Sequence, residues 1–154
     1  MKKIEKQSVT IWNLFSLQNA IITFLITGIT FFFFEDVQWV RKILVIIVIW
    51  ALYTFITDLI AHHLTYNNAA YELTDNILYI QNGGFSRHEN TIPLNRIQHA
   101  DIEQSFYSRF FDLYALNIYT AGANHTIEYI KREVADDLRN KITQINTKEM
   151  GLHE

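Results

Sequence analysis

A run of 24 residues without a charge, from Ile11 to Phe34, constrains this chain more than any other feature. As a helix it would be roughly 36 Å long, which is enough to cross a hydrocarbon core of about 30 Å. The run is too long for the apolar core of a signal peptide, and Phe31–Phe34 offers no small-residue cleavage site. The sequence therefore predicts a membrane-spanning helix.

A second apolar run covers Ile43–Thr57 and reaches about 20 residues when its apolar flanks are included, the length that a span needs. Arg41, Lys42 and Asp58 lie near its ends, where charged side chains can reach the interface. Only Glu35–Lys42 separates the two runs, so we expect a transmembrane hairpin. The alternative is a buried helical hairpin, but the remaining chain is too small to wrap two such helices.

The flanking charges predict the orientation of this hairpin. The tail before the first run carries three lysines and one acid, whereas the loop between the runs carries two basic and two acidic residues. Basic residues favour the cytoplasmic side, so both termini are expected in the cytoplasm. Trp12 and Trp39 fall where interfacial aromatic side chains belong.

The second half of the chain has a strand-rich pattern, in which short apolar segments alternate with turn residues such as Asn82-Gly83-Gly84. Pro93 ends one segment, since it cannot donate a hydrogen bond within a central ladder. Strands are predicted at residues 71–74, 77–81, 87–92, 97–104, 114–121 and 125–130, and 106–113 is predicted to be an irregular or single-turn connection.

After these strands the period changes. Val134, Leu138, Ile142 and Ile145 form one apolar stripe, with Ala135 beside it, as in an amphipathic helix. Such a helix can cover the open end of a small, strongly bent sheet. The predicted domain is therefore α+β.

Composition excludes several functions. The chain has no cysteine, so a disulfide or a thiol nucleophile is impossible. Residues 62–154 carry 8 basic and 12 acidic residues, and this acidic balance argues against nucleic acid and against a phosphoinositide site. The only candidate lipid-facing loop contains Gly83, Gly84, Arg87 and His88.

Catalytic patterns are weak. Ser105 and Ser108 lack a glycine-rich elbow, and the strand that carries Asp101 and Glu103 is expected to turn them toward solvent. Asp58, His62 and His63 are an alternative metal or proton-relay site at the end of the second run, but three mixed ligands fall short of a zinc set. We expect no enzyme activity, metal or cofactor.

One stretch carries a family resemblance. Five segments match one family signature in order: Ile92-Pro93-Leu94, Arg96-Ile97-Gln98, Gln104-Ser105, Arg109-Phe110 and the strand Leu116–Gly122. The signature is that of the bacterial PH-like membrane proteins of the YdbS/YdbT type, which this chain resembles. Asp112 departs from the pattern, which usually has glycine there.

The resemblance implies an α+β membrane protein, in which a two-helix transmembrane hairpin precedes a PH-like small antiparallel β-barrel or sandwich capped by a C-terminal helix. It also implies a non-enzymatic protein of the bacterial cell membrane that acts with a larger relative carrying several such domains, with a role in envelope defence against membrane-active peptides. The expected ranges are a cytoplasmic tail at 1–10, transmembrane helices at 11–34 and 43–62, an outer loop at 35–42, the PH-like domain at 66–146 and a frayed tail at 147–154.

The candidate partner contacts are Arg96, Gln98, Gln104 and Arg109. For the two arginines the alternative is structural, with each guanidinium bound to loop carbonyls at the rim of the barrel. For the whole protein the alternative function is a lipid-binding or lipid-sensing module at the inner membrane surface.

Overall fold

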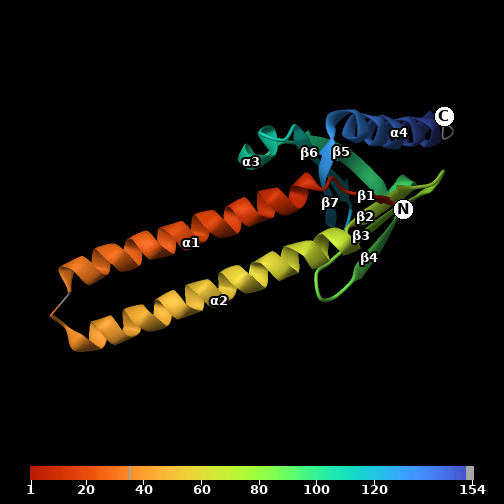
Figure 1. Cartoon of the computed structure of the whole chain (residues 1–154). Coiled ribbons are helices and arrows are strands. Elements are labelled where there is room, and N and C mark those ends of the chain that lie inside the picture. Colours follow the sequence, from red (N-terminus) through yellow and green to blue (C-terminus); the bar gives the residue numbers. More distant parts are fainter. Residues whose placement is uncertain (35, 152–154) are drawn as a thin grey trace.

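Two long antiparallel helices project from a small β-domain (Figure 1). This computed structural model describes the backbone of residues 1–34 and 36–151, and the side chains of that range as far as Ile145. Helix α1 spans Gln7–Phe33 and helix α2 spans Gln38–Asn68. Both are longer than the expected 11–34 and 43–62, because α1 begins earlier and α2 continues into the β-domain. The expected loop at 35–42 is correspondingly shorter, since residues 38–42 are helical.

Most of the surface of both helices is exposed and apolar. Only 11% of the most apolar window of α1 and 6% of that of α2 are buried, so these are not the core helices of a soluble domain. Their threonines are compatible with lipid, because hydroxyls such as those of Thr23, Thr27 and Thr30 donate to the carbonyl four residues earlier. Both helices are long and apolar enough to cross a membrane.

Residues 1–10 were expected to form a tail, but the start of this segment pairs with the β-domain. Strand β1 (Lys2–Lys3) pairs with strand β2, with Lys2 opposite Tyr71 and Lys3 opposite Ala70. The unpaired edge of β2 supplies the hydrogen-bonding partners that this tail needs, and Ile4 is buried directly after it. The segment before α1 is therefore part of the β-domain.

Seven antiparallel strands form two sheets in the described residues. One sheet has the order β1-β2-β3-β4 and the other β5-β6-β7. The two sheets do not close into a barrel, so the sandwich description holds and the barrel description does not. After β1, the strands are β2 (Ala70–Leu73), β3 (Ile77–Asn82), β4 (His88–Pro93), β5 (Ile97–Glu103), β6 (Leu113–Thr120) and β7 (Asn124–Lys131).

The main core lies between the two sheets and the last helix, α4 (Arg132–Gly151). The predicted stripe is confirmed, since Leu138 and Ile142 are buried and Val134 and Ile145 pack against the same core. Helix α4 lies along β5 and β6 (Figure 1). It continues to Gly151, so the frayed tail predicted from 147 is wrong for 147–151, and residues 152–154 lie outside the described residues.

Two short helical turns flank β5. A 3-10 turn (Leu94–Arg96) follows Pro93, and helix α3 (Phe106–Arg109) is a single turn in the connection that was predicted to be irregular or single-turn. Asp112 ends this connection with φ of 53°, in the left-handed region. Glycine adopts that region without cost, and aspartate is one of the few other residues that tolerate it. The departure from the family pattern therefore preserves the turn.

Candidate functional site

A β-bulge in β7 lies where the β-domain contacts the helical hairpin. Tyr114 pairs with Ile130 and Leu116 pairs with Ile127, so β7 has one extra residue in this interval. Tyr129, in the bulge, has φ of 57°. Because of the extra residue, Ile127 and Ile130 both enter the main core although they are three residues apart, while Tyr129 enters a second cluster.

This second cluster, which we call the junction cluster, is built from the tail, α1, α2 and the β-domain. Its buried members are Ile4, Ile11, Ala69, Leu113 and Tyr129. Trp12 packs edge-on against Tyr129, with ring centroids 5.2 Å apart, and the Glu5 amide donates to the Tyr129 carbonyl at 2.9 Å. Burial, with the nearby Glu128 carboxylate, raises the pKa of Tyr129 to about 12. The hairpin and the domain are thus packed together through apolar contacts.

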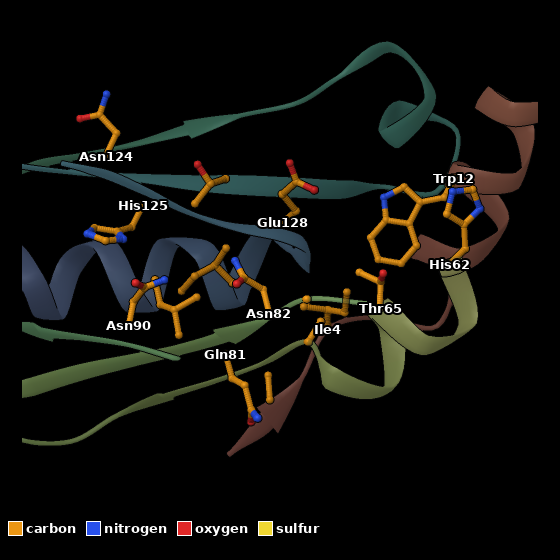
Figure 2. Close-up of a pocket in the computed structure, with 16 residues that line it drawn as sticks. Ile4, Trp12, His62, Thr65, Gln81, Asn82, Asn90, Asn124, His125 and Glu128 are labelled. Atoms are coloured by element: carbon orange, nitrogen blue, oxygen red, sulfur yellow. The ribbon is translucent and has the colours of Figure 1, made fainter. Parts of the chain in front are cut away.

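Beside the junction cluster lies a cleft of about 600 Å³ between the two sheets (Figure 2). Trp12 and His62 stand at its helical end, and β3 and β7 form its two sides. We call it the inter-sheet cleft. Its lining residues are Ile4, Trp12, His62, Thr65, Ala69, Ala70, Ile80, Gln81, Asn82, Gly83, Asn90, Asn124, His125, Thr126, Ile127 and Glu128.

The chemistry of the inter-sheet cleft is polar and mostly uncharged. Its walls carry amide side chains, including Asn82, Asn90 and Asn124, above apolar residues such as Ile80 and Ile127. Amides both donate and accept hydrogen bonds, so they suit the alternating groups of a peptide backbone. Partial desolvation raises the pKa of Glu128, the one carboxylic acid of the lining, although this residue is exposed. Strands β4 and β7 are the end strands of their sheets, so backbone groups lie close to this cleft.

Asp58 and His62 do not join into a metal site. The Ser16 hydroxyl donates to Asp58 Oδ2 at 2.9 Å, and His62 Nδ1 bonds to Asn13 Oδ1, also at 2.9 Å. Both residues therefore join α2 to α1. His63 is exposed. Within the part of the chain that the structure describes, no group of three His, Cys, Asp or Glu side chains could hold a metal ion. Trp12, expected at a lipid interface, also packs against the junction residue Tyr129.

The predicted lipid-facing loop connects β3 and β4 and lies against the end of α2. Gly83 has φ of +124°, and a Cβ atom there would lie 1.9 Å from the Ser86 carbonyl oxygen, so the turn requires glycine. Asn68 Nδ2 donates to the Gly84 carbonyl at 2.8 Å, and Arg87 donates to Asn68 Oδ1 at 3.2 Å. The loop is thus held beside α2, with the side chains of Arg87 and His88 exposed.

The four predicted partner contacts do not form one patch. Arg96 and Gln98 flank the start of β5, whereas Gln104 follows its end and Arg109 lies in α3. A seven-residue strand separates the pairs by roughly 20 Å. Arg96 and Arg109 are both exposed, and among the described residues no hydrogen bond or ion pair holds either guanidinium. The structural alternative, in which these arginines bind loop carbonyls, is not what the structure has.

Helix α3 is the single-turn form of the connection predicted at 106–113, but the sequence analysis did not predict its contact with α1. Tyr107 packs edge-on against Phe15 of α1, with ring centroids 4.5 Å apart, and its hydroxyl donates to Gln18. Phe106 and Phe110 are exposed. A signal was present, because Phe106-Tyr107 and Phe110-Phe111 place four aromatic residues in a short connection that has no strand alternation.

Comparison with known proteins agrees with this architecture. The sequence profile of the bacterial PH domain family matches residues 19–145, most of the chain, so this protein belongs to that family. It is a membrane protein with a PH-like domain and two candidate transmembrane helices.

Two relatives illustrate the relationship. The chain is 25% identical over 146 residues to the UPF0699 transmembrane protein YdbS of Bacillus subtilis strain 168, covering 93% of this chain and 91% of that protein. A crystal structure of a DUF1696 family protein with a pleckstrin-homology domain from Shewanella loihica PV-4 has a TM-score of 0.38 and 17% identity, over 49% of this chain and 68% of that one. The second likeness is too distant to bear on function.

Proposed function

We propose that this protein is a membrane-anchored, non-enzymatic interaction module that assembles with another membrane protein carrying related PH-like domains. The observation that carries the proposal is the inter-sheet cleft, held at a constant position relative to the hairpin by the junction cluster. A binding site packed against its own membrane anchor meets partners in the same membrane at a high effective concentration.

The cleft suits an extended segment of a partner. Its amide side chains can pair with backbone groups, and strands β4 and β7 end their sheets beside it. Addition of a strand at a sheet edge is a common mode of peptide recognition. Two pairs, the exposed Arg96 with Gln98 and the half-buried Gln104 with the exposed Arg109, are proposed as additional partner contacts on two separate surfaces.

The hairpin offers a second surface for the same partner. An apolar groove of about 360 Å³ runs between α1 and α2, lined in part by Phe24, Gly28 and Val45. A Cβ atom at Gly28 would meet nothing within 4 Å, so its small size is not needed inside this hairpin. Small residues at the surface of a span let another helix approach closely.

We further propose that both termini are cytoplasmic, in a bacterial cell membrane. The tail and the domain lie on the same side of any membrane that the hairpin crosses, because β1 is paired with β2. The basic tail favours the cytoplasmic side. Because the chain has no cysteine, single cysteines can map this orientation. Labelling of a cysteine at Asn140 by an impermeant maleimide in intact cells would contradict it.

Site-specific photo-crosslinking in living cells tests the partner. A photo-reactive residue at Asn90, in the inter-sheet cleft, is compared with one at Asn140, an exposed position on α4. We expect a crosslink to a membrane protein with PH-like domains from Asn90 and none from Asn140. The experiment is repeated with a membrane-active peptide in the medium, the condition that envelope defence would require. No crosslink from Asn90 under either condition would overturn the proposal.

The second candidate function is specific lipid recognition at the inner surface. It is favoured by the position of the loop that carries Gly83, Gly84, Arg87 and His88, which lies beside α2. A headgroup site would make binding of the purified full chain depend on which anionic lipid is present. Equal behaviour in vesicles with different anionic headgroups would exclude this candidate and leave the interaction module.

A further inference from the structure

We propose that the β-domain docks onto the membrane surface through an aromatic rim consisting of Phe85, Phe106 and Phe110. These three side chains are 82%, 66% and 70% exposed. The proposed occupant of this surface is the lipid bilayer itself, at the boundary between headgroups and acyl chains. Such contact requires no headgroup pocket, so it is a different property from the lipid recognition considered above.

The first argument concerns depth. The Ser16–Asp58 hydrogen bond marks one level on the hairpin, and the turn between the helices marks its far end. From Ser16 to Phe33 the rise is about 26 Å, and from Trp39 to Asp58 about 29 Å, at 1.5 Å per residue. A hydrocarbon core of about 30 Å therefore extends from the turn to the level of Ser16 and Asp58.

The second argument places α3 at that boundary. Tyr107 contacts Phe15 and Gln18, the residues on either side of the Ser16 level. Figure 1 shows α3 as the part of the β-domain that reaches furthest along α1. Phe106 and Phe110, whose ring centroids are 5.4 Å apart, therefore form an apolar pair at the inner edge of the hydrocarbon layer.

The third argument places Phe85 on the side of α2. A Cβ atom at Gly84 would lie 3.1 Å from Thr65 Oγ1 and 3.8 Å from the Ala61 carbonyl oxygen, so this loop touches α2. Ala61 and Thr65 lie three and seven residues beyond Asp58, about 5–10 Å further from the core. That is the depth of the headgroups, where an aromatic side chain can insert.

The charges agree with this placement. Arg109 lies in α3 with Phe106, and Arg87 follows Phe85 in its loop. Each aromatic position therefore has an exposed guanidinium close by in the chain, which can reach lipid phosphates. The remaining β-domain is acidic overall, so the basic groups at the rim favour this face of the domain over others.

Spin-label depth measurements on the full chain test the inference. Phe85, Phe106 and Phe110 are changed to cysteine one at a time, labelled with a nitroxide, and studied in vesicles of phosphatidylcholine and phosphatidylglycerol. Collision rates with oxygen and with a water-soluble nickel complex are compared. Asn140→Cys is the aqueous control and Phe24→Cys is the control inside the lipid. Because all three rim side chains are exposed, these variants are expected to fold.

The expected result is an oxygen-to-nickel collision ratio several-fold above that at Asn140 and below that at Phe24 for labels at Phe106 and Phe110, and a ratio between those of Asn140 and Phe106 for the label at Phe85. Ratios equal to the Asn140 value would overturn the inference, as would shielding from both reagents, which indicates protein contact at the rim. The inference depends on the hairpin crossing the bilayer, which belongs to the proposed function. The label at Phe24 reports on that point separately, so the two failures can be distinguished.

Discussion

Tyr129 provides a sharp test of the junction between domain and hairpin, because its backbone and its side chain contribute in opposite directions. The side chain is 9% exposed and packs against Trp12. Removal of a buried aromatic side chain typically costs about 3–5 kcal/mol, so Tyr129→Ala is expected to lower the free energy of unfolding by about that amount. The positive φ of 57° adds a second effect.

Alanine at position 129 keeps the Cβ atom and therefore keeps the strain of the left-handed conformation, about 1–2 kcal/mol. Glycine relieves that strain but loses roughly 0.5–1 kcal/mol relative to alanine through its larger backbone entropy. Tyr129→Gly should therefore be more stable than Tyr129→Ala by about 0.5–1 kcal/mol. At an ordinary strand position the order is the reverse, and Ile127, buried in the same strand, provides that control.

The measurement is urea unfolding of the full chain in detergent micelles, followed by pulse proteolysis, for the Ala and Gly variants at both positions. The midpoint should be higher for glycine than for alanine at 129, and lower for glycine at 127. If glycine is the less stable variant at both positions, residue 129 is not strained and the proposed bulge geometry is wrong.

Three further predictions concern single positions. The φ of Asp112, 53°, suits only glycine and a few polar residues. Asp112→Gly should therefore be neutral or stabilising by up to about 1 kcal/mol, and Asp112→Val should be destabilising by about 1–2 kcal/mol. Thermal or urea unfolding measures both changes. Since partial desolvation raises the pKa of Glu128, which stays exposed, its small contribution to stability is present below the unfolded value of 4.5 and is lost as the pH rises through the folded value. Unfolding midpoints measured across that range should fall slightly less steeply for Glu128→Gln, and identical pH profiles would contradict the desolvation. Gly84→Leu should push the loop away from Thr65 and increase amide hydrogen exchange over residues 83–87, and unchanged exchange would show that the loop does not touch α2.

Much of the fold was predictable because its signals are local. An uncharged run longer than 20 residues can bury itself only in lipid or in a large core, and this chain is too short to form such a core. Strand alternation, the glycine turn at Gly83 and the helical stripe of Leu138 and Ile142 likewise depend on residues close in sequence. Their predicted positions agree with β3, β7 and α4 within a few residues.

The candidate site was less predictable because it depends on contacts between distant residues. The inter-sheet cleft is lined by Trp12 and His62 together with Asn90 and Glu128, and no sequence period relates these positions. The partner contacts chosen by family resemblance fall on two surfaces, because a strand of seven residues lies between them. The single turn of α3 was expected only as a connection, and its aromatic contact with α1 was not predicted.

The sequence by itself determined a two-helix apolar hairpin followed by a small antiparallel domain with a C-terminal helix. Those features follow from hydrophobic period and length, which each segment carries independently of the others. Only the tertiary structure decided that the tail pairs with β2, that Tyr129 faces the hairpin, and that two aromatic segments lie beside α1 and α2. The physical reason is that an unpaired strand edge and a buried side chain are satisfied by whichever group the fold brings close, and short-range pattern does not specify that group.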